Sequence, residues 1–425
     1  MMNTINDSDP YQRPIRGAWL TVVLLFIVGF LNYLDRIMLT TMRGSIVDAI
    51  PMTDAQFGLL TSVFLWVYGL LSPYAGFLAD RFSRSKVIII SLFVWSAVTW
   101  LTAHAQTFEQ LLATRALMGI SEACYIPAAL ALIADYHRGS TRSLAMGIHN
   151  GGIMIGQSMG FLGGWIAENH HWTFAFSVFG AFGILYAVLM FFTLKDVPGG
   201  RSVVPVSSTN PAEKIRFVNG IKVLFKQRSF ILLVAFWGLL GIVGWMILGW
   251  LPTYYQEHFS LSQTMAGLYA TWYVYPLSLV GVLLGGFLAD RWFRSNQYAR
   301  ILLPAIGLLI AAPAAYMAGS TDVLFLAIAG FMVYALTRTF TDTNLMPILC
   351  MIADEKYRAT GYGILNMFAC IVGGLSIYAG GVLRDASVNT QVLFKISGIT
   401  MVACAIILWV IKSMYARSMA SSPKA

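Results

Sequence analysis

The feature that most constrains the fold is a series of long apolar runs that recur along the whole chain. Ala18–Leu34, Val87–Ala103 and the run around Val402–Ile411 are examples. A run of about twenty apolar residues is long enough for a helix to cross a bilayer. Lipid offers the backbone no hydrogen-bond partners, and continuous rather than alternating runs favour helices over a barrel. The composition agrees, because 58% of the 425 residues are hydrophobic and only 11% are charged.

These runs predict an all-α membrane protein with twelve transmembrane helices, six in each half of the chain. We expect the first six at about 17–41, 55–79, 87–103, 108–136, 143–167 and 173–194. We expect the second six at about 230–257, 263–289, 301–318, 323–353, 359–383 and 393–413. The predicted domains are a tail at 1–16, a six-helix bundle at 17–194, a linker at 195–229, a second bundle at 230–415 and a tail at 416–425. Part of the linker, Pro211–Phe225, fits a short amphipathic helix at the membrane surface.

An internal repeat relates the two halves. The hexapeptide Gly76–Arg81 recurs without change as Gly286–Arg291, about 210 residues later, which is half the chain. Further along, Arg142–Asn150 matches Arg358–Asn366 at a similar offset and in the same order. A long repeat of this kind indicates one ancestral half used twice.

The charge distribution predicts the topology. The chain has 28 Lys and Arg against 19 Asp and Glu, a net charge of +9. When both termini are placed inside, only Arg43, Arg384 and Lys395 of the basic residues fall outside, as the positive-inside rule requires. We expect a monomer in the cytoplasmic (inner) or plasma membrane with both termini cytoplasmic, and no binding of nucleic acid. The four cysteines are widely spaced within apolar runs, so neither a metal site nor another cofactor is expected.

A charged motif follows the second predicted helix and is repeated in part after the eighth. Its members are Gly76, Asp80, Arg81 and Arg84, with Asp290 and Arg291 in the repeat. The motif resembles the signature loop of the major facilitator superfamily. This resemblance implies two pseudo-symmetric six-helix bundles with a substrate site between them near mid-membrane. It also implies a conformational latch, in which the Asp carboxylate caps a neighbouring helix end; the alternative is that these charges only set the topology.

Three stretches narrow the resemblance within the superfamily. Asn32–Arg36, Arg115–Pro127 and Trp250–Tyr254 are similar to the anion:cation symporter group, whose members carry organic anions such as sugar acids. The first two also resemble spinster-like transporters of sphingoid and lysophospholipid substrates. The third stretch and Gly363–Gly374 favour the symporters, and hence an anionic substrate.

Six ionisable residues within predicted spans are candidates for function, because a charge there costs at least a few kcal/mol unless it is paired, solvated or functional. They are Asp35, Arg36, Arg115, Glu122, Arg338 and Asp342. We expect Arg36 to face the central cavity and bind a substrate carboxylate through its planar fork, and Asp35 to face the fourth predicted helix. Arg338 is expected to supply a second cationic contact that is released when Asp342 takes up a proton. The alternative for Arg36 is a structural ion pair. The alternative for Arg338 and Asp342 is that they neutralise one another.

Glu122 and Asp35 are the predicted protonation sites, with Arg115 beside them. Burial and a neighbouring Arg act in opposite directions on a carboxyl group, so their competition can bring its titration near neutrality. The alternative is a fixed ion-pair network.

Uncharged substrate contacts are expected from a further set of side chains. Resemblance to the symporters implies Tyr33, Tyr68 and Asn366; Asn32 shares a helix face with Arg36, and Asn150 is the repeat-mate of Asn366.

The predicted function is proton-coupled symport of a small organic anion, such as a hexuronate or aldonate. The first alternative is a spinster-like lipid transporter, and the second is a sensor built on a transporter fold. No nucleophile–base constellation is visible, so an enzyme is not expected.

Overall fold

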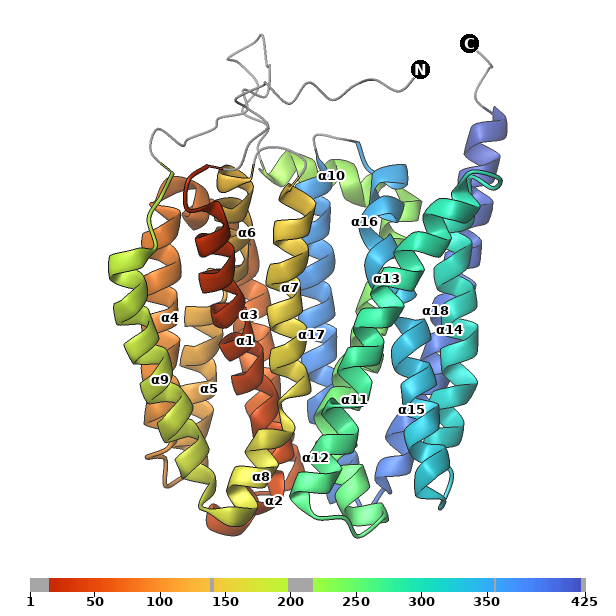
Figure 1. The fold of residues 1–425 in the computed structure, drawn as a ribbon. Helices are drawn as coiled ribbons and strands as arrows, with labels where there is room; N and C mark the ends of the chain where they lie inside the picture. Colours follow the sequence, from red (N-terminus) through yellow and green to blue (C-terminus); the bar gives the residue numbers. More distant parts are fainter. Residues whose placement is uncertain (1–14, 138–140, 198–216, 355–356, 422–425) are drawn as a thin grey trace.

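Every long apolar run of the sequence is helical in the computed structural model, and the helices lie side by side in one bundle (Figure 1). The structure describes residues 15–137, 141–197, 217–354 and 357–421. Helix α1 begins, and α18 ends, at the upper end of the bundle in Figure 1, which we call the termini end. The other is called the opposite end.

Within the described residues, each half of the chain forms nine helices, and those of the first half come first. They are α1 Ala18–Thr41, α2 Arg43–Ala49, α3 Asp54–Arg81, α4 Arg84–Thr102, α5 Phe108–Glu122, α6 Tyr125–Tyr136, α7 Arg142–Ser158, α8 Phe161–Asn169 and α9 Trp172–Thr193. Only α2 was not expected; it is a short helix of seven residues that follows α1 directly.

The second half forms nine more. They are α10 Phe217–Lys226, α11 Arg228–His258, α12 Gln263–Thr271, α13 Val274–Phe293, α14 Ala299–Ala318, α15 Leu324–Arg338, α16 Phe340–Ile352, α17 Arg358–Asp385 and α18 Thr390–Ser421. Helix α10 lies within the predicted linker, where the sequence favoured an amphipathic helix, and it packs against α11 and α17. In the described part of the chain, eleven helical segments are long and apolar enough to span a membrane. The remaining predicted span is divided between α7 and α8, of 17 and 9 residues.

Four predicted spans are interrupted rather than continuous. Two interruptions are related by the internal repeat: α5 ends at Glu122, before a turn at Ala123 and Cys124, and α15 ends at Arg338, before Thr339. Non-helical backbone at membrane depth is tolerated where it is buried in protein or lines a cavity. In both interruptions the last residue of the helical segment carries a charged side chain.

Glycines allow the helices to approach very closely. A Cβ added at Gly152 or Gly156 of α7 would lie 2.4 or 2.2 Å from the carbonyl oxygen of Phe26 or Phe30 on α1. Similarly, a Cβ at Gly381 of α17 would lie 2.3 Å from the carbonyl oxygen of Asp54 on α3. Such close packing at small residues is typical of membrane helix interfaces.

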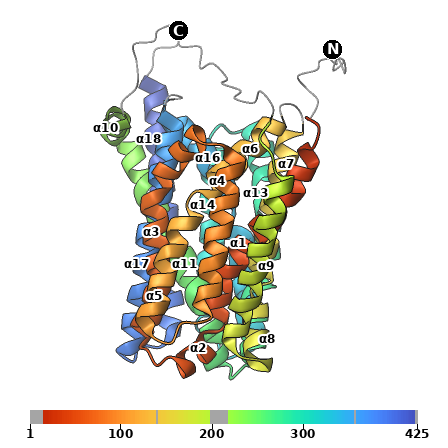
Figure 2. The same ribbon diagram turned by 90° about the vertical axis from the view of Figure 1, so that its left-hand side faces the viewer.

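The halves meet mainly along α3 and α17, which lie side by side (Figure 2). Ser62 Oγ donates to the carbonyl oxygen of Gly374 at 2.6 Å, and Trp66 Nε1 donates to that of Ile371 at 3.1 Å. On the other side of the bundle, α8 packs against α12. These contacts build a seam between the halves.

We expect Gly156→Ala to destabilise the first half, because its methyl group has no room against Phe30. Overpacking of this kind costs about 1–3 kcal/mol, and it should lower the melting temperature of the purified protein. The control is Gly147→Ala on the same helix, where an added Cβ meets nothing within 4 Å. Equal melting temperatures for the two variants would contradict the packing described.

Candidate functional site

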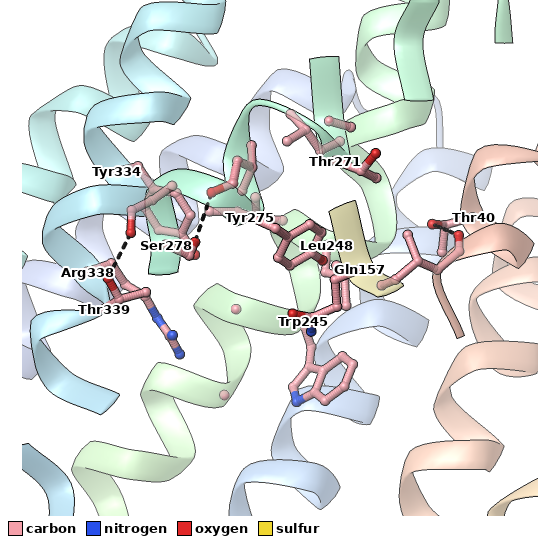
Figure 3. Close-up of a pocket in the computed structure, with 18 of the residues that line it drawn as sticks. Thr40, Gln157, Trp245, Leu248, Thr271, Tyr275, Ser278, Tyr334, Arg338 and Thr339 are labelled. Carbon is pink, nitrogen blue, oxygen red and sulfur yellow. Dashed lines mark hydrogen bonds between the residues drawn. The ribbon is translucent and has the colours of Figure 1, made fainter. Parts of the chain in front are cut away.

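A cavity of about 270 Å³ lies between the two halves (Figure 3). Most of its wall comes from α11, α12, α13, α15 and α17 of the second half, and α1 and α7 of the first half also contribute. Its apolar wall includes Trp237, Leu240, Ile247, Leu251 and Val274. Its polar wall includes Gln157, Tyr275, Ser278, Tyr334, Arg338 and Asn366. The cavity therefore offers a solute both apolar surface and a polar side.

Of the described residues that line the cavity, Arg338 alone is charged. Its Nη1 lies 2.6 Å from Oδ2 of Asp342, one turn along the chain, and its side chain is 19% exposed. The Nε atom is buried without a hydrogen-bond partner among the described residues. Gly244 faces the guanidinium from α11, since an added Cβ there would lie 3.4 Å from Nη2. Arg338 is thus neutralised on one side and has an unused donor on the other.

The predicted uncharged contacts fall in different places. Tyr33 and Asn366 line the cavity, and Asn366 Nδ2 donates to Ser72 Oγ at 3.4 Å across the two halves. Asn32 is fully buried beside the cluster described next, whereas Asn150 is exposed on α7. Neither is among the residues that line the cavity.

Arg36 does not lie on the cavity wall. Its Nε donates to Glu122 Oε2 at 2.7 Å, and the two side chains are 6% and 0% exposed. The guanidinium also lies over the rings of Tyr33, Phe64 and Tyr68, at 4.5, 4.8 and 4.8 Å from their centroids. An ion pair and three aromatic faces therefore surround it, and both kinds of contact compensate a desolvated cation.

Asp35 and Arg115 complete a cluster of two acidic and two basic groups. Asp35 is 3% exposed and accepts a hydrogen bond from Thr99 Oγ1 on α4 at 3.1 Å. It was expected to face the span 108–136; its hydrogen bond goes to the preceding helix, while Arg115 and Glu122 of α5 are close enough to interact with it electrostatically. Arg115 Nη2 donates to Thr102 Oγ1 at 3.3 Å. The two negative and the two positive groups balance one another inside the first half.

A second, much smaller pocket lies beside this cluster. Its volume is about 20 Å³, and its lining includes Arg36, Arg115, Thr61, Trp245 and Leu248. A volume of roughly 10–15 Å³ holds one water if polar groups face it. Arg115 Nε is buried without a hydrogen-bond partner among the described residues, whereas Arg36 Nη2 lies 2.7 Å from Glu122 Oε2.

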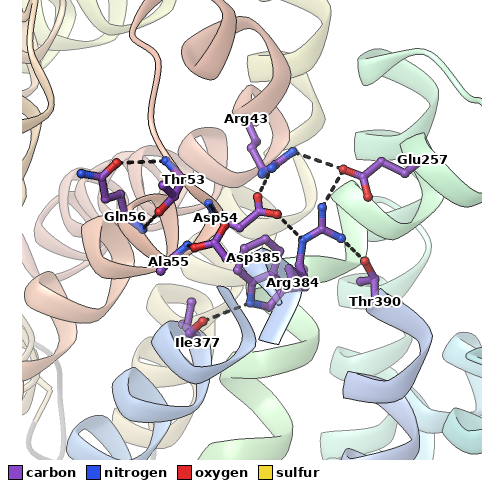
Figure 4. A network of polar contacts seen from close by, with 11 residues as sticks. Arg43, Thr53, Asp54, Ala55, Gln56, Glu257, Ile377, Arg384, Asp385 and Thr390 are labelled. Carbon is purple, nitrogen blue, oxygen red and sulfur yellow. Dashed lines mark hydrogen bonds and ion pairs between the residues drawn. The ribbon is translucent and has the colours of Figure 1, made fainter. Parts of the chain in front are cut away.

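An ion-pair network joins the halves at the opposite end (Figure 4). Asp54 of α3 pairs with Arg43 and, at 3.0 Å, with Arg384 Nε of α17. Glu257 of α11 lies 3.3 Å from Arg43 Nη1 and 2.8 Å from Arg384 Nη2. Asp385 Oδ1 and Oδ2 accept the backbone N–H groups of Asp54 and its neighbour at 2.8 and 2.9 Å. The sequence marked Arg43 and Arg384 only as charges on the outer side; their spacing along the chain gives no sign of the network.

The signature motif is only partly within the described residues. The surroundings of Gly76 and the side chains of Asp80 and Arg81 lie outside them. Arg84 Nη1 donates to the carbonyl oxygen of Ala131 at 3.0 Å and pairs with Asp135.

In the repeat of the motif, Asp290 Oδ1 accepts from Arg300 Nη2 at 3.0 Å, while Arg291 is exposed. The contacts of Arg84 and of Asp290 each stay within one half. The latch between the halves therefore stays a prediction.

Comparison with known proteins places these features in context. A model of the Major Facilitator Superfamily matches residues 25–376. Protein spinster homolog 1 of Xenopus tropicalis is 27% identical over 86% of this chain and 72% of its own length. A probable sulfoacetate transporter, SauU, of Cupriavidus necator is 26% identical over 91% of this chain and 92% of its own. The crystal structure of a bacterial homolog of the human lysosomal transporter spinster, inward-facing and unoccupied, has a TM-score of 0.76 at 23% identity, covering 96% of this chain and 97% of that one.

We expect Arg384→Ala to loosen the opposite end, because it removes the contacts of this guanidinium with both Asp54 and Glu257. Hydrogen bonds to charged groups contribute about 1.5–3 kcal/mol each. Amide hydrogen exchange in residues 54–55 should therefore speed up roughly tenfold or more. The control is Arg300→Ala, which breaks an ion pair within the second half alone. Unchanged exchange in Arg384→Ala would show that the network does not hold the halves together.

Proposed function

Because the chain belongs to the Major Facilitator Superfamily and is a membrane transporter, we propose that it carries a small organic anion together with a proton. The finer proposal is symport of a sugar acid, such as a hexuronate or aldonate, by alternating access. The single observation that carries it is the pairing of buried carboxylates with arginines in both halves: Glu122 with Arg36, and Asp342 with Arg338. In each pair the charge of the arginine is neutralised for as long as its carboxylate is ionised.

Arg338 is the proposed anion contact. It lies on the cavity wall and has a buried Nε without a partner among the described residues. Protonation of Asp342 would free Nη1, so that a carboxylate could be bound by the two parallel N–H groups of Nη1 and Nη2. Tyr275 and Tyr334 place hydroxyl groups beside the same wall. The cavity volume of about 270 Å³ lies near the lower limit of ligand pockets, about 300–1,000 Å³, which favours a small solute.

The cluster around Glu122 is the proposed site of proton coupling. Its charges balance when both carboxylates are ionised, because Asp35 and Glu122 face Arg36 and Arg115. A proton on Glu122 would leave one positive charge in excess inside the first half. That excess raises the affinity of the cavity region for an anion, and loss of the anion would in turn favour loss of the proton, since linkage is reciprocal.

The ion-pair network between the halves supports a closed opposite end. The network of Arg43, Asp54, Glu257 and Arg384 joins the halves there. If both termini are cytoplasmic, as the distribution of basic residues predicts, this end faces outward. Opening it would require these ion pairs to separate as the halves rock.

A second candidate function is transport of an amphipathic lipid. The apolar wall of the cavity, which includes Trp237, Leu240 and Val274, favours it, as does the similarity to spinster proteins. Arg36 and Asn150, two of the predicted polar substrate contacts, do not line the cavity. They therefore do not count against a lipid substrate. A lysolipid with an anionic head would still use Arg338.

We expect Glu122→Gln to abolish accumulation driven by a pH gradient, while exchange of pre-loaded solute continues. Glutamine keeps an oxygen acceptor for Arg36 but cannot lose a proton. Both activities are measured with reconstituted vesicles. The control is Glu109→Gln, an exposed carboxylate at the start of the same helix. Driven accumulation that persists in Glu122→Gln would remove this residue from coupling.

We expect Arg338→Ala to weaken anion binding roughly 10- to 150-fold, since a hydrogen bond to a charged group contributes about 1.5–3 kcal/mol. The measurement is a thermal-shift titration of purified protein with hexuronates, aldonates, neutral sugars and lysolipids, because a bound ligand raises stability by mass action. Arg300→Ala serves as a control for loss of a surface arginine. Stabilisation by lysolipids alone would favour the second candidate, and an anion affinity unchanged in Arg338→Ala would exclude this contact.

A further inference from the structure

The cavity and the small pocket share part of their walls. Thr40, Trp245 and Leu248 line both, so these three side chains separate the cavity that contains Arg338 from the pocket that contains Arg36 and Arg115. Trp245 is the largest of the three and comes from α11 of the second half, whereas the ion cluster belongs to the first. Because it lines both spaces, we place the indole between the proposed anion contact and the proposed proton site.

The indole is held in this position from behind. A Cβ added at Gly373 of α17 would lie 2.2 Å from Cδ1 of Trp245, so only glycine leaves room for the ring. Trp245 itself is half-buried, because its other face borders the cavity. One face of the indole thus packs against the backbone of Gly373, and the other face is accessible to a solute in the cavity.

The pocket behind the indole has the properties of a one-water site. Its volume of about 20 Å³ exceeds the roughly 10–15 Å³ that one water needs. Arg115 Nε is a buried donor without a partner among the described residues, and Thr61 adds a hydroxyl to the wall. Arg36, whose Nη2 lies 2.7 Å from Glu122 Oε2, lines the same pocket, so a water there would lie beside the guanidinium that pairs with Glu122.

We propose that Trp245 is a partition that separates the solute cavity from the buried ion cluster, and that a solute entering the cavity displaces it. Displacement joins the two spaces and lets water reach the Arg36–Glu122 pair, so that Glu122 exchanges its proton only when solute is present. Trp245 is thus a positioning residue for coupling and makes no contact with the proton. The inference rests on the proposed function and adds the physical reason why proton and solute move together.

The first test measures the partition without any transport. In a background with the four native cysteines replaced by serine, Thr61→Cys is exposed to a small anionic methanethiosulfonate reagent. Thr61 lines only the small pocket, so labelling should be slow while Trp245 is in place. With Trp245→Leu added, labelling should speed up about tenfold or more, as expected when a barrier of a few side-chain contacts is lost.

The matched control is Trp237→Leu, which removes an indole from the cavity wall but not from the small pocket. Equal labelling in Trp245→Leu and its parent, or equal acceleration by Trp237→Leu, would overturn the partition. If Trp245→Leu does not fold, Gly373→Ala moves the indole without removing it, and the same acceleration is expected. No acceleration in that variant would count against the proposal in the same way.

The second test measures coupling. In vesicles loaded with a pH-sensitive dye, the wild-type protein should move protons only when solute is added, and Trp245→Leu should move them without it. Glu122→Gln placed in the Trp245→Leu variant should stop this leak, and Trp245→Phe should restore the dependence on solute. A proton current that needs solute in Trp245→Leu would refute the coupling role. If the wild type moves no protons at all, the proposed function fails, while Thr61→Cys labelling still decides whether the partition exists.

Discussion

The structure depends first on four charges that have been brought into apolar surroundings. Removing an ion from water costs several kcal/mol even after relaxation, and a partner must compensate for it. Asp35, Arg36, Arg115 and Glu122 achieve this together, with Thr99 and three aromatic rings as additional contacts. Because the charges balance only as a set, a proton gained by one carboxylate changes the energy of all the others. The helices α1, α4 and α5 are held together by groups that respond to a single proton.

The internal repeat gives the two halves the same framework but uses it differently. In both halves the fourth span is interrupted after a charged residue, Glu122 in one and Arg338 in the other. The first is fully buried and paired across helices, whereas the second pairs within its own span and faces the cavity. For the function proposed above, sealing one charge and exposing the other would separate the proton-coupling group from the anion contact.

The sequence predicts most of the fold, because hydropathy is a local property and each span carries its own signal. It also identifies every costly charge in the membrane. It does not identify the partners of these charges, because Arg36 and Glu122 are 86 positions apart and no local sequence pattern links the two segments. The interruption at Thr339 was missed because we expected one continuous helix over 323–353, although residues 337–344 are mostly polar. Arg43 and Arg384 satisfied the topology rule as loop charges, so no local pattern paired them with Asp54 and Glu257.

Helix α11 connects the separate parts of the site. It carries Trp237 on the cavity wall, Trp245 between the cavity and the small pocket, and Trp250 beneath the ion-pair network. Trp250 is fully buried, with the guanidinium groups of Arg43 and Arg384 at 5.9 and 5.2 Å from its ring. Beyond it Pro252, which has no N–H to donate, is a point where the helix can bend. A bend there would fall between Leu248 and Pro252, the stretch that carries Trp250, about one turn beyond Trp245. If a solute displaces Trp245 as proposed, this bend would transmit the displacement to Trp250 and so link occupancy of the cavity to closure of the opposite end.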